Sequence, residues 1–252
     1  MKASGVTTLD LSLKTKYTSA ILAKTIDQSI LKPTSTTQDF EEAVKEAKQF
    51  GYRSLCVHPC KVNAIKSMLS GTDVLIAVVC DFPHGRGLTN TRVADIKELL
   101  KLGVDEIDIV SRYERLREGD LKDFEADTRS VIKAMGGKPL KIILEVDALT
   151  KDQIRNAVKI IGKIVKEEKA KNIIVKTKTG FVDFKMANLD AVHIIKETLE
   201  GMDLYAKTTD EIQAGTIGVK ASGGVKTKED AIELLEAGAH ILGSSSGAVI
   251  CS

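Results

Sequence analysis

Short runs of branched aliphatic residues alternate along the chain with longer segments whose apolar residues recur at helical spacing. Before one such segment, Thr36 and Asp39 form a capping-box pattern, and Gly51 suits its end. Eight alternating β and α units with no evident linker predict one (β/α)8 barrel (TIM barrel), with a doubly wound open sheet as the runner-up. The predicted strands span residues 25–31, 53–58, 73–81, 105–110, 140–146, 172–177, 216–221 and 239–244.

Two stretches stand apart from this alternation. Residues 1–24 precede the first predicted strand and form a short N-terminal extension, which we expect to be helical. Residues 25–252 then make up the barrel domain. The stretch 199–215 is more polar than its surroundings, so we interpret it as a surface excursion before the seventh strand.

Side-chain alternation separates an aliphatic face from a charged face on several predicted strands. In residues 105–110, Ile107 and Ile109 share one face, whereas Asp108 lies on the other. We expect the aliphatic face against the helices and the charged face inside the barrel. The charged interior positions are Glu106, Asp108, Lys141, Lys176 and Lys220.

Depth along the strands divides these charges into two groups. Glu106 and Lys141 are nearer the strand starts, where paired interior charges are structural. Asp108, Lys176 and Lys220 come at the C-terminal ends, where barrels of this type place their chemistry. Buried charges are costly without partners, so a purely structural ion-pair cluster remains an equal alternative from geometry alone.

Glycine- and serine-rich loops follow the last two predicted strands. Lys220 leads into "ASGGVKT" (221–227), and the final strand leads into "GSSSG" (243–247). Backbone amides and serine hydroxyls in such loops can hold a phosphate, and barrels often place one after strands seven and eight. Together the loops predict a phosphate site, which Gly180 can extend.

Composition narrows the class of protein without naming a reaction. The 252 residues are 43% hydrophobic and 29% charged with a net charge of +2, so neither a nucleic-acid nor a membrane partner is expected. No apolar run approaches a membrane span, and the N-terminus lacks signal-peptide features. Four irregularly spaced cysteines indicate free thiols in a reducing, cytoplasmic compartment. No metal is expected, because the spacings of Cys56, His58, Cys60, Cys80 and His84 fit no common zinc site.

Six motifs, in order over residues 25–247, resemble the 2-deoxyribose-5-phosphate aldolase family of class I aldolases. The more specific pair is "VKTKTGF" (175–181) and "GVKASGGVKT" (218–227); the others are "IDQSILKP" (26–33), "FPHG" (82–85), "DEIDIV" (105–110) and "GSSSG" (243–247). The resemblance implies reversible cleavage of 2-deoxy-D-ribose 5-phosphate to D-glyceraldehyde 3-phosphate and acetaldehyde. It also implies a homodimer or homotetramer.

The resemblance assigns roles to individual residues. It implies an imine on Lys176, a perturbing lysine at Lys220 and a proton relay through Asp108. Lysine chemistry agrees, since a neighbouring ammonium and desolvation favour the neutral amine, and the protonated imine makes a metal or other cofactor unnecessary. The implied substrate and phosphate contacts are Asp27, Ser29, Cys56, Gly180, Gly223, Gly224, Gly243, Ser245 and Ser246.

Some positions depart from the family pattern. Lys178 stands where relatives usually have serine; it lies beyond the apolar run beside Gly180, where we expect a solvated cation that meets the phosphate. Ser29 replaces a frequent threonine, the 199–215 stretch is longer than expected, and the tail "AVICS" lacks a tyrosine found in some relatives. Two alternatives stay open: an aldolase that uses dihydroxyacetone phosphate as donor, and a phosphate-binding barrel without aldolase activity.

Overall fold

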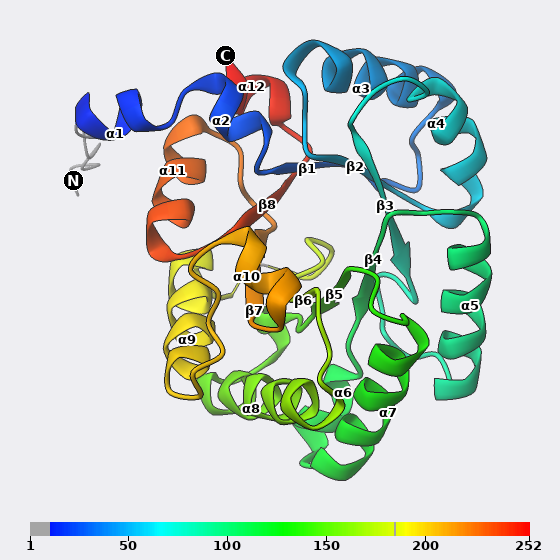
Figure 1. Cartoon of the computed structure of the whole chain (residues 1–252), viewed down its shortest axis with the longest axis vertical. Helices are drawn as coiled ribbons and strands as arrows, with labels where there is room; N and C mark the ends of the chain where they lie inside the picture. Colours follow the sequence, from blue (N-terminus) through cyan, green and yellow to red (C-terminus); the bar gives the residue numbers. More distant parts are fainter. Residues whose placement is uncertain (1–10, 184) are drawn as a thin grey trace.

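Eight parallel strands close into a barrel in the computed structural model, which describes residues 11–183 and 185–252. Each strand pairs with the next, and β8 closes onto β1 (Figure 1). The predicted barrel is therefore confirmed and the open sheet is wrong. The strands are β1 (Ile26–Ile30), β2 (Ser54–Val57), β3 (Leu75–Cys80), β4 (Glu106–Val110), β5 (Leu140–Ile143), β6 (Ile173–Lys176), β7 (Ile217–Ser222) and β8 (Ile241–Ser244).

Helices surround the barrel and begin where the sequence provides caps. The side chains of Thr36, Thr150 and Thr227 each accept a hydrogen bond from the backbone three residues later, and Gly51 ends its helix in the left-handed conformation. The main helices are α3 (Thr37–Phe50), α4 (Val62–Met68), α5 (Thr89–Lys101), α6 (Tyr113–Glu118), α7 (Leu121–Ala134), α8 (Lys151–Glu168), α9 (Asn188–Glu200), α10 (Thr209–Ala214), α11 (Lys228–Ala237) and α12 (Gly247–Cys251). Short 3-10 turns cover Pro59–Lys61 and Val146–Ala148.

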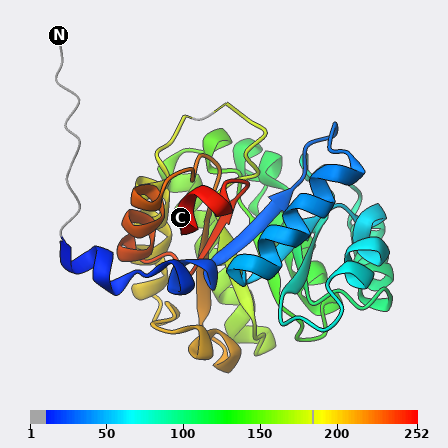
Figure 2. The same cartoon turned by 90° about the horizontal axis from the view of Figure 1, so that it is seen from above.

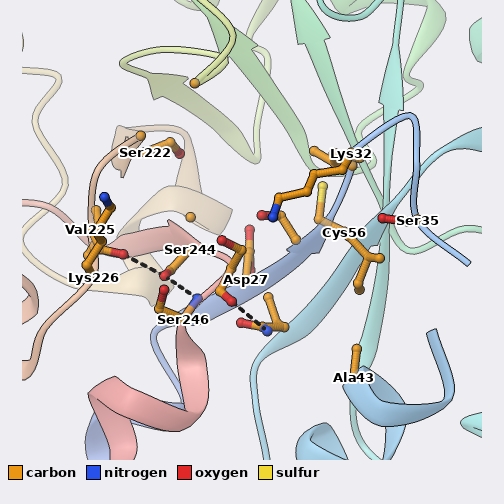
Figure 3. Close-up of a pocket in the computed structure, with 18 of the residues that line it drawn as sticks. Asp27, Lys32, Ser35, Ala43, Cys56, Ser222, Val225, Lys226, Ser244 and Ser246 are labelled. Carbon is orange, nitrogen blue, oxygen red and sulfur yellow. Dashed lines mark hydrogen bonds between the residues drawn. The ribbon is translucent and has the colours of Figure 1, made fainter. Parts of the chain in front are cut away.

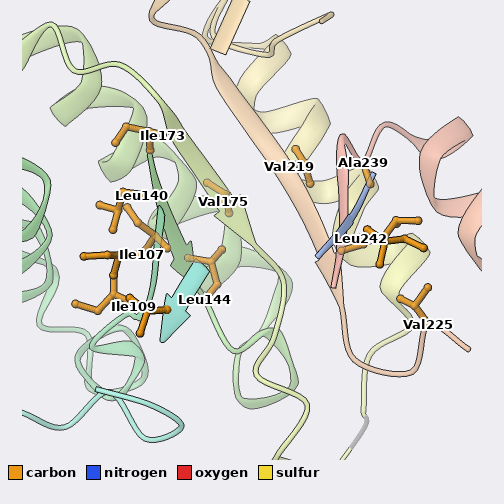
Figure 4. Close-up of a cluster of buried hydrophobic side chains, with 14 of the residues drawn as sticks. Ile107, Ile109, Leu140, Leu144, Ile173, Val175, Val219, Val225, Ala239 and Leu242 are labelled. Carbon is orange, nitrogen blue, oxygen red and sulfur yellow. The ribbon is translucent and has the colours of Figure 1, made fainter. Parts of the chain in front are cut away.

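The hydrophobic core lies between the strands and the helix layer. Ile107, Ile109, Val175 and Val219 are buried there, as strand alternation predicts (Figure 4). Their neighbours along the strands point into the barrel. The alternation thus directs the charged side chains to the barrel axis.

Two short helices precede the first strand: α1 (Leu11–Lys16) and α2 (Ser19–Ala23). They agree with a helical N-terminal segment, and residues 1–10 of the expected extension lie outside the described residues. Leu22 is buried, and α2 lies beside α12 near the C-terminus (Figure 2). Within the described ranges, no helix is long and apolar enough to cross a membrane.

The 199–215 stretch is mostly exposed, as predicted for a surface excursion, and it also closes one end of the barrel. It contains α10, which lies at the end opposite the long loop that follows β6 (Figure 2). Ile212 of this helix packs with Ile174 and Ile241 inside the barrel. A Cβ atom on Gly218 would lie 2.5 Å from Ile212 Cδ1, so the missing side chain of this glycine leaves room for Ile212. Ala206, from the same stretch, belongs to this cluster as well, so a few apolar positions anchor a largely polar segment to the barrel.

Candidate active site

The side chains of Asp108, Lys176 and Lys220 meet inside the barrel. Asp108 Oδ2 lies 2.8 Å from Lys176 Nζ and 2.8 Å from Lys220 Nζ. Register produces this meeting, because Lys176 on β6 pairs directly with Lys220 on β7 and both project inward. Asp27 on β1 completes the group with an oxygen 2.5 Å from Lys220 Nζ. The sequence-predicted convergence of the three residues is confirmed.

The charges nearer the strand starts form the predicted ion pair, and this pair is continuous with the group above it. Lys141 Nζ lies 2.5 Å from Glu106 Oε2 and 2.9 Å from Asp108 Oδ1. Arg53, which directly precedes β2, joins the network as well: its Nη1 lies 2.7 Å from Asp27 Oδ1 and 2.8 Å from Glu106 Oε2. We call Arg53, Lys141, Lys176, Lys220, Asp27, Glu106 and Asp108 the buried charge cluster.

Burial disfavours every charge in this cluster, and the partners decide the outcome. For Asp108 the three surrounding ammonium groups outweigh burial and hold the pKa of the carboxyl well below its usual range. For Lys220 burial is outweighed by Asp108 and Asp27, so its pKa is raised. For Lys176 burial, helped by the like charge of Lys220, outweighs Asp108 and lowers its pKa. Of these two lysines, Lys176 is the one whose neutral, nucleophilic form is favoured.

A cavity of about 860 Å³ opens above Lys176 and Lys220. Asp108 is fully buried and is connected to the cavity through these two lysines. The volume suits a small phosphorylated sugar together with water. The predicted residues on its lining are Asp27, Ser29, Cys56, Lys176, Gly180, Lys220, Gly223, Gly224, Gly243, Ser245 and Ser246.

The two glycine-serine loops lie side by side at the cavity wall (Figure 3). Ser244 Oγ joins them, since it donates to Val225 O at 2.7 Å and accepts from Ser246 N at 2.9 Å. Gly243 provides room rather than a polar group: a Cβ atom there would lie 2.3 Å from Ser222 Oγ. The loops are therefore braced before any ligand arrives.

Lys178 does not occupy the position that the sequence suggested. Its side chain is 1% exposed, and its Nζ lies 2.9 Å from Asp147 Oδ2 and 2.8 Å from Met186 O. The expectation of a solvated cation at the phosphate is wrong. Because β6 ends at Lys176, strand alternation no longer governs Lys178, and the loop turns it toward the carboxylate after β5.

Several residues that brace the site escaped the sequence analysis. Glu145 accepts hydrogen bonds from the backbone and hydroxyl of Thr179, next to Gly180. Asn188, at the start of α9, donates to Gly223 O at 2.5 Å and accepts from Thr177 Oγ1 at 3.0 Å. Glu145 shares strand parity with Lys141 in the predicted strand 140–146, a signal that could have found it, whereas nothing in the sequence marked Asn188.

Cys56 lines the cavity as a buried thiol on β2. Burial raises the pKa of this thiol to about 11, so it is neutral near pH 7. His58 Nε2 lies 3.1 Å from Leu31 O and Cys60 is exposed. Across residues 11–183 and 185–252, no three histidine, cysteine, aspartate or glutamate side chains are placed to hold a metal ion.

Comparison with known proteins gives a consistent result. Residues 21–252 match the model of the DeoC/LacD family aldolase. A deoxyribose-phosphate aldolase from Dictyoglomus turgidum is 37% identical, over 91% of this chain and 95% of the relative. One from Staphylococcus saprophyticus is 35% identical, over 90% of this chain and 94% of the relative. A solved structure from Coccidioides immitis matches with a TM-score of 0.80 and 31% identity, over 93% of this chain and 85% of that one.

Proposed function

This chain belongs to the DeoC/LacD family of aldolases, and from that premise we propose that it cleaves 2-deoxy-D-ribose 5-phosphate reversibly, with Lys176 as the imine-forming residue. The observation that carries the assignment of Lys176 is the contrast between two adjacent lysines. Both lysines line the cavity, but Lys176 has a lowered pKa and, within the described structure, one carboxylate partner, whereas Lys220 is held charged by two carboxylates. An amine must be neutral to attack a carbonyl.

The chemical steps follow from this arrangement. The Lys176 amine attacks the substrate aldehyde, and loss of water gives a protonated imine. Removal of the proton from the C3 hydroxyl lets the C2–C3 bond break: C3 becomes the aldehyde carbon of the departing D-glyceraldehyde 3-phosphate, and the electron pair of the bond forms the enamine on Lys176. Protonation at C2 and hydrolysis release acetaldehyde and restore the amine. We assign the proton relay to Asp108, Lys220 and water, because both residues adjoin Lys176.

We assign the substrate phosphate to the two braced loops. Gly223 and Gly224 adopt positive φ and lie on the cavity wall with Ser245 and Ser246. Gly180 lies across from them, since a Cβ on it would be 3.8 Å from Gly223 Cα. Backbone amides in such concave loops bind anions without a dedicated cation. Lys178 is therefore not required for phosphate binding.

Trapping the imine tests the proposed reaction. The protein is incubated with acetaldehyde or with dihydroxyacetone phosphate, reduced with borohydride, and digested for peptide mapping. We expect a reduced acetaldehyde adduct on Lys176. An adduct formed with the ketose phosphate alone would instead support the other aldolase, and no adduct on Lys176 or Lys220 would refute both. The burial of Lys178 removes one reason for considering the ketose phosphate.

A charge placed at Gly224 tests the phosphate site. This residue is exposed on the cavity wall, and a Cβ there would meet nothing within 4 Å. Gly224→Asp is expected to lower kcat/KM for the phosphorylated sugar roughly 100-fold by like-charge repulsion, with little change for 2-deoxyribose. Gly224→Asn is the matched control, because it has the same shape and backbone strain without the charge. Equal losses on the two substrates in the aspartate variant would place the phosphate elsewhere.

Two further predictions from the sequence concern the oligomeric state and the cellular compartment. Assembly as a homodimer or homotetramer stays a prediction that light scattering coupled to gel filtration can check. Residence in the cytoplasm likewise stays a prediction; it agrees with four cysteines that are all free thiols.

A further inference from the structure

The buried charge cluster contains four cationic side chains and three carboxylates. The cations are Arg53, Lys141, Lys176 and Lys220, and the anions are Asp27, Glu106 and Asp108. The cluster is therefore one positive charge in excess when every group is ionised. A charge excess in a buried site is costly, so the site favours the loss of one proton.

The contacts show which cation is best placed to lose that proton. Arg53 is effectively always protonated, and it contacts both Asp27 and Glu106. Lys141 lies within 3.3 Å of all three carboxylates, and Lys220 contacts two of them. In the described part of the chain, Lys176 has an ion pair with Asp108 alone.

The other groups around Lys176 do not cancel the excess. Cys56, from β2, is a thiol whose raised pKa of about 11 keeps it neutral. Glu145, after β5, is bonded to Thr179 and lies beside Asp147 and Lys178 rather than in the cluster. The charged groups that face Lys176 are thus those of the cluster itself: Asp108 on β4, Lys141 on β5, Lys220 on β7 and Asp27 on β1.

We propose that Arg53 is a positioning residue for catalysis, which supplies the surplus positive charge and thereby keeps Lys176 in its neutral, nucleophilic form. Arg53 does not touch the reacting atoms. It forms ion pairs with Asp27 and Glu106 and so offsets part of their negative charge. Lys141 and Lys220 then depend more on Asp108 for their stabilisation than they would without Arg53. The network then has too little negative charge to keep Lys176 protonated as well. This inference rests on the proposed function of Lys176.

The pH dependence of kcat/KM for the phosphorylated sugar tests the inference. Activity rises with pH as Lys176 loses its proton, and this rising limb is the readout. Arg53→Met removes the surplus charge, so the limb is expected to move to higher pH by roughly one unit, which is a roughly tenfold loss below the limb. Arg53→Lys keeps the charge and is expected to keep the wild-type limb.

Two further variants separate the charge effect from a loss of packing. Glu106→Gln raises the excess to two charges and is expected to move the limb to lower pH. Arg53→Met combined with Glu106→Gln restores an excess of one and should return the limb toward its wild-type position. A merely structural role would make the double variant worse than either single one. Thermal unfolding of each variant confirms that a folded protein is being assayed.

The outcomes are distinguishable from failure of the proposed function. If wild-type protein forms an acetaldehyde adduct on Lys176 but Arg53→Met leaves the limb in place, the function stands and the inference fails. The inference also fails if the rising limb of the Arg53→Met, Glu106→Gln double variant lies at the same pH as that of Arg53→Met alone. Absence of any wild-type adduct would instead remove the proposed function.

Discussion

Replacement of Lys176 by alanine is expected to lower kcat by at least about 10⁴-fold while leaving the barrel folded. In the proposed mechanism this amine is the covalent nucleophile, and the neighbouring Lys220 is held protonated by Asp108 and Asp27. The fold is expected to tolerate the change because Lys176 has a single ion pair among the described residues, with Asp108, which keeps Lys141 and Lys220 as partners. Without it, three cations face three carboxylates in the buried charge cluster. The measurements are steady-state kinetics and borohydride trapping.

Lys101→Ala is the matched control for this variant. Lys101 ends α5, and its side chain is 71% exposed in a surface ion pair with Glu98. Its removal should change neither kcat nor trapping, because exposed pairs contribute little. Circular dichroism and the unfolding midpoint show whether the Lys176 variant is folded. Substantial turnover in a folded Lys176→Ala protein would contradict the assignment of the nucleophile.

Asp108→Asn is expected to impair both activity and stability. Asp108 is fully buried, with Lys141, Lys176 and Lys220 all within 2.9 Å. The amide cannot balance these ammonium groups, and breaking a buried pair in this way costs about 3–5 kcal/mol. Turnover should fall by roughly 10³-fold or more, because the proton relay loses its carboxylate. Urea unfolding and kcat measure the two effects.

The same chemical change on the surface provides the comparison. Asp152 lies in the first turn of α8 with a side chain 88% exposed, paired with Arg155. Asp152→Asn should alter the free energy of unfolding by less than about 0.5 kcal/mol and leave kcat unchanged. If Asp108→Asn proved equally mild, the carboxylate would be neither the balancing charge nor the relay that its contacts indicate.

The cluster shows how a barrel can keep reactive charges in its interior. Each carboxylate is shared between two or more cations, which offsets the cost of burial. Lys220 sits between Asp27 and Asp108 and stays charged, so its field acts on the neighbouring Lys176. The stabilising network and the proposed catalytic residues are therefore one set of side chains.

The sequence by itself determined the barrel and the direction of the strand side chains. The eight β-rich runs and the capped helices between them led to the observed order of elements. Alternation placed Asp108, Lys176 and Lys220 inside because each lies within a hydrogen-bonded strand, where the pleat fixes the face of every residue. The sequence also predicted that the glycine-serine loops lie at the C-terminal end of the barrel strands, since they follow β7 and β8 directly.

Only the tertiary structure decided what happens just outside the strands. Arg53 shares sequence parity with Leu55 and Val57, which face the helices, yet it turns inward because β2 begins one residue later. Lys178 shares parity with Lys176, yet it is drawn to Asp147 because β6 has already ended. Beyond a strand end no pleat constrains the side chain, so its ion-pair partners fix its place. For Arg53 and Lys178 those charges lie on distant segments, which only folding brings within reach.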